Sequence, residues 1–404
     1  MSLLENMPTT LEIKKNLENR WLAFLNSNAR KFAAKNLSGA TPPSVFVGAY
    51  GYPKVKVGPM IPPLHGDTSI FDSPEKWLGK NLAEIASYRM SLVRGVFDID
   101  AHTTSGKQIE SLQEVAMANS PAESELLFEK VPFIDMEQKK NTGIDADSAP
   151  YGLTAPLKNF KASSSFSVDK RIEKVFYDKD LPSKESVMNL YHDGVEISKI
   201  NRILSLGMVG LKKNRKLVPT KWSISATDST ISANLIKKTT IENYQPVDLF
   251  EVYKYSHLYN HYSVVLIPFS TWSFEMQEGW LDSKGNIGMG SDFEDVRGLN
   301  HYPHIAGAYF AGRLSIAEHL NKVKRKAAAL VLREIHPQYI FPVGVWQIRE
   351  GIREALKGPF REFENLDNAI SFAVSSLSIS KKEWIRNSMI YQCVKEQKRI
   401  SEYF

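Results

Sequence analysis

The sequence contains almost no cysteine: Cys393 is the single example among its 404 residues. One cysteine excludes an intramolecular disulfide and a cysteine-based zinc site, and it fits a reducing compartment. The sequence also lacks any stretch of about 18 uncharged apolar residues, which a membrane-spanning helix would need. Its first residues do not form the apolar core of a signal peptide, because Glu5 and Asn6 follow Leu3 and Leu4 directly. We therefore expect a cytoplasmic protein without a membrane span.

Familiar catalytic motifs are absent as well. The sequence has no P-loop, no Gly-x-Gly-x-x-Gly, no Gly-x-Ser-x-Gly elbow and no His-Glu-x-x-His. Each of these motifs places backbone amides, a nucleophile or metal ligands at a fixed spacing. Their absence therefore disfavours a familiar ATPase, Rossmann enzyme, α/β-hydrolase or zincin. The excess of positive charge is small, with a net charge of +6 and a pI near 9.0, so contact with nucleic acid is permitted but not required.

Hydrophobic periodicity predicts an α+β fold, with a mixed larger N-terminal part that contains antiparallel strands and a smaller, mainly helical C-terminal part. The glycine-rich, acidic stretch 285–300 predicts a boundary, which gives domains at 1–290 and 291–396 and a tail at 397–404. We expect helices at 9–38, 72–92, 107–118, 314–334, 346–357, 366–377 and 380–396, and a helical hairpin across 183–206. We expect strands at 45–47, 55–57, 93–102, 125–131 and 218–225, and a pair of strands across 247–269.

The densest basic run in the N-terminal part leads into a tryptophan. Its members are Lys212, Lys213, Arg215, Lys216 and Lys221, followed by Trp222. Cations beside an aromatic ring can grip phosphates and stack a base, which favours contact with DNA, and the alternative is a solvated loop. A second run falls within an expected helix and could follow a phosphate backbone from one helix face; it consists of Lys322, Lys324, Arg325 and Lys326.

Two further arginines, Arg349 and Arg353, lie one helical turn apart. Their guanidinium groups can therefore converge on one anion, such as a DNA phosphate. Glu334, Glu350 and Glu354 are interleaved with them, so the alternative is an Arg–Glu lattice that joins two helices.

Two groups of carboxylates and histidines could bind a divalent cation, Mg²⁺ or Mn²⁺, and so support phosphodiester cleavage. One group shares a face of an expected strand, although an exposed strand face shows the same alternation; it consists of Asp98, Asp100 and His102. The other shares a loop rich in Pro and Gly, although turns also require Asp and Gly; it consists of His65, Asp67 and Asp72. These groups underlie an alternative function, a metal-dependent nuclease or phosphodiesterase acting on damaged DNA.

A further group of candidates consists of two histidines, His301 and His304, which flank Pro303 in a short turn. The two histidines could be ligands or phosphate contacts. The alternative is a structural role for both side chains.

The last eight residues, Gln397 to Phe404, show a distinctive spacing: Gln, two residues, an aliphatic, two residues, then two aromatics. One helical turn would place Ile400, Tyr403 and Phe404 on the same side. Three apolar side chains on a short tail suit a pocket on another protein, and Gln397 would fix their register. The alternative is a final turn that folds back onto the protein's own body.

This tail resembles the clamp-binding peptide, or PIP motif, by which replication and repair proteins attach to PCNA-type sliding clamps. Several internal segments then point to one family. They are Val45-Phe46-Val47-Gly48 with Gly51-Tyr52-Pro53 and Val57-Gly58-Pro59, Asp72-Ser73-Pro74, Leu92-Val93-Arg94-Gly95, Arg215 to Ile224, and Pro342 to Gly351. With the tail, the chain resembles the archaeal Nre DNA-repair family over nearly its whole length.

The resemblance implies an archaeal cytosolic protein of the DNA-damage response with a large N-terminal and a smaller C-terminal domain. It also implies recruitment to PCNA, with the clamp-binding residues carried over onto Gln397, Ile400, Tyr403 and Phe404. Many family members have, near the N-terminus, a short cysteine motif that looks zinc-binding. This chain has none, so zinc is not expected. No reaction comes with the resemblance, and the expected function is a repair factor that binds the clamp and DNA.

Overall fold

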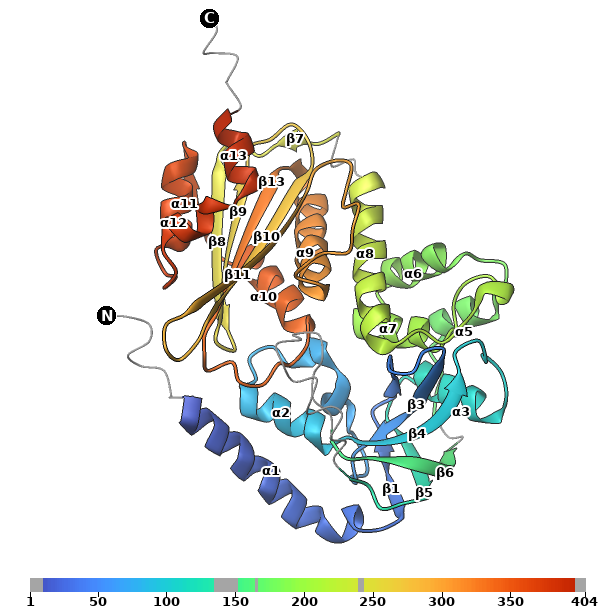
Figure 1. The fold of residues 1–404 in the computed structure, drawn as a ribbon. Helices are drawn as coiled ribbons and strands as arrows, with labels where there is room; N and C mark the ends of the chain where they lie inside the picture. Colours follow the sequence, from blue (N-terminus) through green and yellow to red (C-terminus); the bar gives the residue numbers. More distant parts are fainter. Residues whose placement is uncertain (1–9, 134–151, 164–165, 239–242, 397–404) are drawn as a thin grey trace, which may run out of the picture. The chain divides into compact units, whose positions relative to one another are not determined.

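The structure is a computed structural model, and it describes residues 10–133, 152–163, 166–238 and 243–396 (Figure 1). The chain forms two compact units. Among the described residues, the N-terminal unit takes in residues 11–231 with 341–344, and the C-terminal unit takes in residues 232–340 and 345–396. Helices and strands of both parallel and antiparallel pairing occur, so the predicted α+β class is confirmed. No helix in the described ranges combines the length and apolarity needed to cross a membrane.

The N-terminal unit contains a six-stranded sheet in the order β1-β5-β6-β4-β3-β2. The strands are β1 (Asn36–Thr41), β2 (Val45–Val47), β3 (Lys54–Ile61), β4 (Val93–Asp100), β5 (Ala122–Phe128) and β6 (Thr154–Ala162). Neighbouring strands are antiparallel except β4 and β6, which are parallel. The helices are α1 (Thr10–Phe32), α2 (Leu82–Ser91), α3 (Lys107–Met117), α5 (Lys170–Tyr177), α6 (Ser183–His192), α7 (Ile197–Ser205) and the start of α8 (Thr220–Lys238).

The helix predicted across 72–92 begins later than expected, at Leu82. Asn81 caps its first turn, and Glu84 returns a hydrogen bond to the Asn81 amide, which is a complete capping box. Asp72 instead ends a short 3-10 turn, η1 (Ser69–Asp72), and a second turn, η2 (Pro74–Lys76), follows it. The predicted start of this helix at residue 72 is therefore wrong.

Two other predictions fail because the local pattern fits both kinds of element. Residues 218–225, predicted as a strand, include the first turns of α8, and Ile231 and Leu235 are buried four residues apart along that helix. The helix predicted at 314–334 ends early, because Lys324 adopts a left-handed backbone with φ 58°. The following residues form a strand, β13 (Ala328–Ile335), in which every residue is buried.

The C-terminal unit contains a second six-stranded sheet in the order β11-β10-β13-β9-β8-β14. Its strands are β8 (Phe250–His257), β9 (Asn260–Ile267), β10 (Ser273–Leu281), β11 (Ile287–Glu294), β13 and β14 (Phe360–Phe363). Only β10 and β13 pair in parallel within this sheet. Because the sheet combines strands from both sides of residue 290, this compact unit extends across the boundary that the sequence predicts there. A short separate pair joins β7 (Gln245–Pro246) to β12 (Arg325–Lys326).

Helices cover both faces of this second sheet (Figure 1). One face packs against α11 (Leu366–Val374), α12 (Lys381–Arg386) and α13 (Met389–Glu396), with Val265, Leu330 and Trp384 in the shared core. The other face packs against α9 (Gly307–Val323) and α10 (Trp346–Lys357). Gly351 permits close approach there, because a Cβ at this position would lie 2.5 Å from the Tyr262 ring.

Candidate functional site

The predicted basic run forms a short 3-10 helix, η3 (Lys212–Asn214), just before α8. Its arginine, Arg215, is already engaged. The guanidinium donates to the backbone oxygens of Gly210, Phe176 and Asp178, each at 2.8 Å. Arg215 therefore fixes the run to the end of α5, and this role was missed by sequence reasoning.

The four lysines of the run remain exposed, and the described residues contain no ion pair to them; they are Lys212, Lys213, Lys216 and Lys221. Unpaired lysines keep their full charge for phosphates, which is the first requirement of a nucleic-acid surface.

Trp222 follows Lys221 directly in the sequence, and its exposed ring pairs with the ring of Tyr52. The ring centroids are 5.4 Å apart and the planes are tilted by 55°. Trp222 is 45% exposed and Tyr52 is 37% exposed, and Tyr50 in the same β2–β3 loop is 82% exposed. The Val47 amide donates to the Thr220 hydroxyl at 2.9 Å, which ties strand β2 to the start of α8. Exposed rings next to unpaired lysines can stack bases while the cations hold the backbone.

A cavity of about 310 Å³ lies elsewhere in the N-terminal unit. Its charged lining consists of Lys76, Arg171, Lys199, Arg202, Asp169 and Glu196. Four cations against two carboxylates leave an excess of two positive charges. Hydrogen bonds from Arg171 and Lys199 hold the pKa of Asp169 well below its usual range, and burial lowers the pKa of Lys199. Arg171 and Lys199 already pair with Asp169, and Arg202 pairs with Asp72, so three of these four cations are engaged. No sequence pattern had indicated this cavity.

The predicted loop group does not converge on one point. His65 lies against Glu123, with Nδ1 and Oε2 2.6 Å apart. Asp67 accepts from the Ser69 amide at 3.0 Å in a turn, and this bond lowers the pKa of Asp67. Asp72 is buried and accepts from Arg89 at 2.5 Å. Turn chemistry and a buried ion pair thus account for these side chains.

The side chains of the predicted strand group do not come together as a set of metal ligands either. Asp98 and Asp100 are exposed on β4, opposite Lys56 and Lys54 of β3. Asp100 accepts from the His102 amide at 2.8 Å, and this bond lowers the pKa of Asp100. Within the described ranges, neither this group nor the loop group offers three ligand atoms close enough together to hold one ion.

Of the two arginines of α10, Arg353 forms Arg–Glu pairs of the kind that the sequence left as an alternative, and Glu350 is the member of the predicted lattice that it contacts. Arg353 donates to both carboxylate oxygens of Glu318 on α9, at 2.8 and 2.7 Å, and to Glu350 at 2.7 Å. Arg349 is buried, with 3% of its surface exposed. The structure thus uses Arg353 to join two helices, and it gives Arg349 little access to an external anion.

The second basic run does not lie on one helix, so its predicted continuous helical face is wrong. Lys324 ends α9, and its ammonium lies 5.3 Å from the centre of the Tyr244 ring. Arg325, in β12, donates to the Pro246 oxygen at 3.0 Å and to Asp248 at 3.1 Å.

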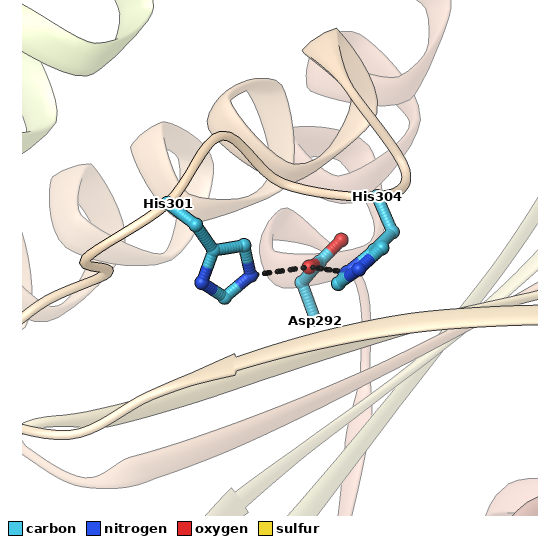
Figure 2. Close-up of side chains that lie close together, drawn as sticks. All are labelled: Asp292, His301 and His304. Carbon is cyan, nitrogen blue, oxygen red and sulfur yellow. Dashed lines mark hydrogen bonds and ion pairs between the residues drawn. The ribbon is translucent and has the colours of Figure 1, made fainter.

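His301 and His304 do come together with a third residue, Asp292, which sequence reasoning missed (Figure 2). Asp292 Oδ1 lies 2.9 Å from His304 Nδ1 and 3.6 Å from His301 Nε2. Asp292 comes from β11, and both histidines come from the loop that follows it, before α9. The signal in the sequence was a His-x-x-His pair after a strand that ends in acidic residues. The predicted clamp-binding residues Gln397, Ile400, Tyr403 and Phe404 lie outside the described residues.

Comparison with known proteins covers most of the chain. A family model described as "Archaeal Nre, N-terminal" matches residues 16–284, and one described as "Archaeal Nre, C-terminal" matches residues 294–403. Two relatives from Archaeoglobus fulgidus are named DNA repair protein NreB and DNA repair protein NreA. The first is 36% identical over 88% of this chain and 89% of the relative, and the second is 34% identical over 85% of each.

A relative from Haloferax volcanii, also named DNA repair protein NreA, is 31% identical over 87% of this chain and 86% of the relative. No solved structure matches the chain.

Proposed function

The chain belongs to the archaeal Nre family, and from this premise we propose that it is a cytoplasmic DNA-repair protein that binds the PCNA sliding clamp and contacts DNA. Relatives named DNA repair proteins align with more than four fifths of the chain, which supports the repair role. The observation that carries the DNA contact is the exposed Trp222–Tyr52 ring pair at the end of a run of exposed lysines.

The clamp contact rests on the spacing of Gln397, Ile400, Tyr403 and Phe404. The preceding helix, α13, supports it, because this helix is anchored to the C-terminal unit's sheet. Glu275 on β10 accepts from the Ser388 hydroxyl at 2.9 Å and from the Ile390 amide at 2.7 Å. A tail that starts from a fixed helix loses less freedom when it binds than one that starts from a mobile segment.

The DNA contact requires both charge and stacking. Lys212, Lys213, Lys216 and Lys221 would neutralise phosphates, while Trp222 would stack a base, with Tyr52 holding its ring in place. Rings of this kind accept any base, so the expected substrate is an exposed single strand rather than a particular sequence. Single-stranded DNA is also a feature that many lesions share.

Fluorescence anisotropy of a labelled single-stranded oligonucleotide, measured at several salt concentrations, tests the DNA contact. Replacing all four lysines by Ala should weaken binding and reduce the slope of log K against log salt by about 2.8, because each phosphate contact on a single strand contributes about 0.7. The matched control replaces four other exposed lysines of the same unit, Lys14, Lys15, Lys107 and Lys130. An equal reduction in that control, or an unchanged slope in the test variant, would reject this surface.

A second candidate, a metal-dependent nuclease or phosphodiesterase, is favoured by one observation: Asp292, His301 and His304 converge. Incubating the protein and Mn²⁺ with nicked, flapped and crosslinked DNA separates the two functions. Cleavage by the wild type that is lost in the His304→Ala variant would support the nuclease. Binding without cleavage would support the non-catalytic repair factor.

A further inference from the structure

Three side chains with metal-ligating atoms lie close together where β11 gives way to the loop before α9 (Figure 2). One carboxylate from the strand and two imidazoles from the loop face a common point there. In the described part of the chain, no other trio of His, Cys, Asp or Glu brings ligand atoms this close together. A role for this trio goes beyond the repair function, since it depends on neither the clamp nor DNA.

The Asp292 carboxylate is buried, with 1% of its side chain exposed. Its Oδ2 atom accepts from the Ile305 amide at 2.8 Å, whereas Oδ1 faces the two imidazoles. Removing a carboxylate from water is costly unless a cation compensates its charge. Oδ1 meets the two imidazoles, so a metal ion held between these three side chains would compensate its charge.

His301 is oriented by its neighbour. Its Nδ1 atom lies 2.8 Å from Asn300 Oδ1, which can only accept, so Nδ1 carries the hydrogen. In the neutral ring, Nε2 then has a free lone pair directed at Asp292 Oδ1. Two acceptors that face each other at 3.6 Å repel unless something positive lies between them. A metal-binding histidine usually donates its other ring N–H to a carboxylate, carbonyl or water, which fixes the orientation of the ring.

The separations fit an ion. Ligand atoms bound tetrahedrally at about 2.0–2.1 Å lie about 3.3 Å from one another. The two separations from Asp292 Oδ1, 2.9 Å to His304 Nδ1 and 3.6 Å to His301 Nε2, bracket that value. All three ligand atoms lie within 4.8 Å of one another, so small side-chain adjustments would complete the coordination.

We propose that Asp292 Oδ1, His301 Nε2 and His304 Nδ1 bind a divalent transition-metal ion. Two imidazoles and one carboxylate suit Zn²⁺, Mn²⁺, Fe²⁺, Co²⁺ or Ni²⁺ better than Mg²⁺ or Ca²⁺, which prefer oxygen alone. The absence of a cysteine motif does not exclude zinc here, because this site needs no thiolate. The side chains of His301 and His304 are 47% and 76% exposed, so the ion is reachable from solvent. Three protein ligands leave a further position for water or for an oxygen of a bound phosphate.

Calorimetric titration of the metal-stripped full chain with Zn²⁺ and with Co²⁺ tests this site, and the visible absorption of Co²⁺ reports the ligand set. We expect one equivalent to bind. Replacing His301 or His304 by Ala should weaken that binding at least tenfold, and the double variant should lose it. Asn300→Ala should weaken binding by about tenfold, as is usual when the partner that orients a ligand is removed. All these side chains are exposed, so the variants should fold as the wild type does.

His65 and His102 provide matched controls, because each lies within 2.8 Å of a carboxylate but lacks a third ligand. Their Ala variants should bind the metal as the wild type does. Absence of binding by the wild type would overturn the proposal. Unchanged binding by the double variant of His301 and His304 would also overturn it.

Discussion

Arg333 and Glu278 form an ion pair between adjacent strands of the C-terminal unit's sheet, and their side chains are only 1% and 2% exposed. The two residues are direct partners in the parallel pairing of β13 and β10. Arg333 also donates to Asn260 Oδ1 at 2.9 Å, which holds the guanidinium toward the end of β9. Each charge therefore depends on the other, because no water is available to replace a lost partner.

Replacing Glu278 by Gln should lower the free energy of unfolding by about 3–5 kcal/mol, since the variant leaves the Arg333 charge buried without compensation. Urea unfolding followed by circular dichroism measures the change. The control is Glu354→Gln, which breaks an ion pair to Lys357 whose two side chains are 23% and 63% exposed. That variant should change stability by less than about 1 kcal/mol. A small effect at Glu278 would mean that the pair is not a stabilising feature of the sheet.

The sequence predicts elements well where one face of a helix is buried. The hairpin of α6 and α7 and the bounds of α10 follow from apolar residues at helical spacing. It fails at β13, because all eight residues are buried and such a run has no period to distinguish a strand from a helix. The preceding helix pattern then extends through it, and the pairing of β13 with β10 and β9 decides the outcome.

The candidate sites show the same limit. The lysines and Trp222 occupy one run, so the sequence brings them together on its own. Tyr52 belongs to a different hairpin and meets Trp222 only in the folded unit, where Val47 of that hairpin also donates to Thr220. Asp292 similarly precedes its histidines by a loop whose length fixes no geometry.

His261 makes the C-terminal unit sensitive to acid. Burial, assisted by the neighbouring His336, lowers the pKa of His261 to about 4, although Glu334 acts in the opposite direction. The unfolded chain binds the same proton at a pKa of about 6.5. Between these values the unfolded state holds more protons, so the free energy of unfolding falls as the pH drops from about 6.5 to about 4. The full effect is about 3 kcal/mol, of which about 2 kcal/mol is expressed by pH 5.

Urea unfolding of the wild type and of His261→Gln at about pH 7 and about pH 5 measures this contribution. The wild type should lose more stability between the two values than the variant does. Some dependence will remain in the variant, because burial also lowers the pKa of His319 to about 4. Equal losses in both proteins would show that His261 takes up its proton without unfolding.

Trp222→Ala should weaken single-stranded DNA binding by about 1–3 kcal/mol, a loss of about 5- to 150-fold, because one base loses its stacking partner. Unlike the loss of the lysines, this change should leave the salt dependence unaltered. Phe360→Ala is the control. Like Trp222, Phe360 is an exposed ring paired with a tyrosine: it is 46% exposed and stacks on Tyr253, with the ring centroids 5.0 Å apart. Anisotropy that changes equally in both variants would argue against a specific role for Trp222.

The spacing of the tail predicts which of its side chains bind the clamp and which do not. A helical turn over residues 400–404 would place Tyr403 and Phe404 on the same side as Ile400, whereas Lys398 and Ser401 fall between the positions that define the spacing. Replacing Tyr403 and Phe404 together by Ala should cost about 4 kcal/mol of clamp binding, roughly 1000-fold, and so abolish a micromolar complex. Replacing Lys398 and Ser401 by Ala should leave the affinity almost unchanged. Calorimetry against the purified clamp compares the two double variants, and equal affinities would show that the aromatic pair is not what the clamp recognises.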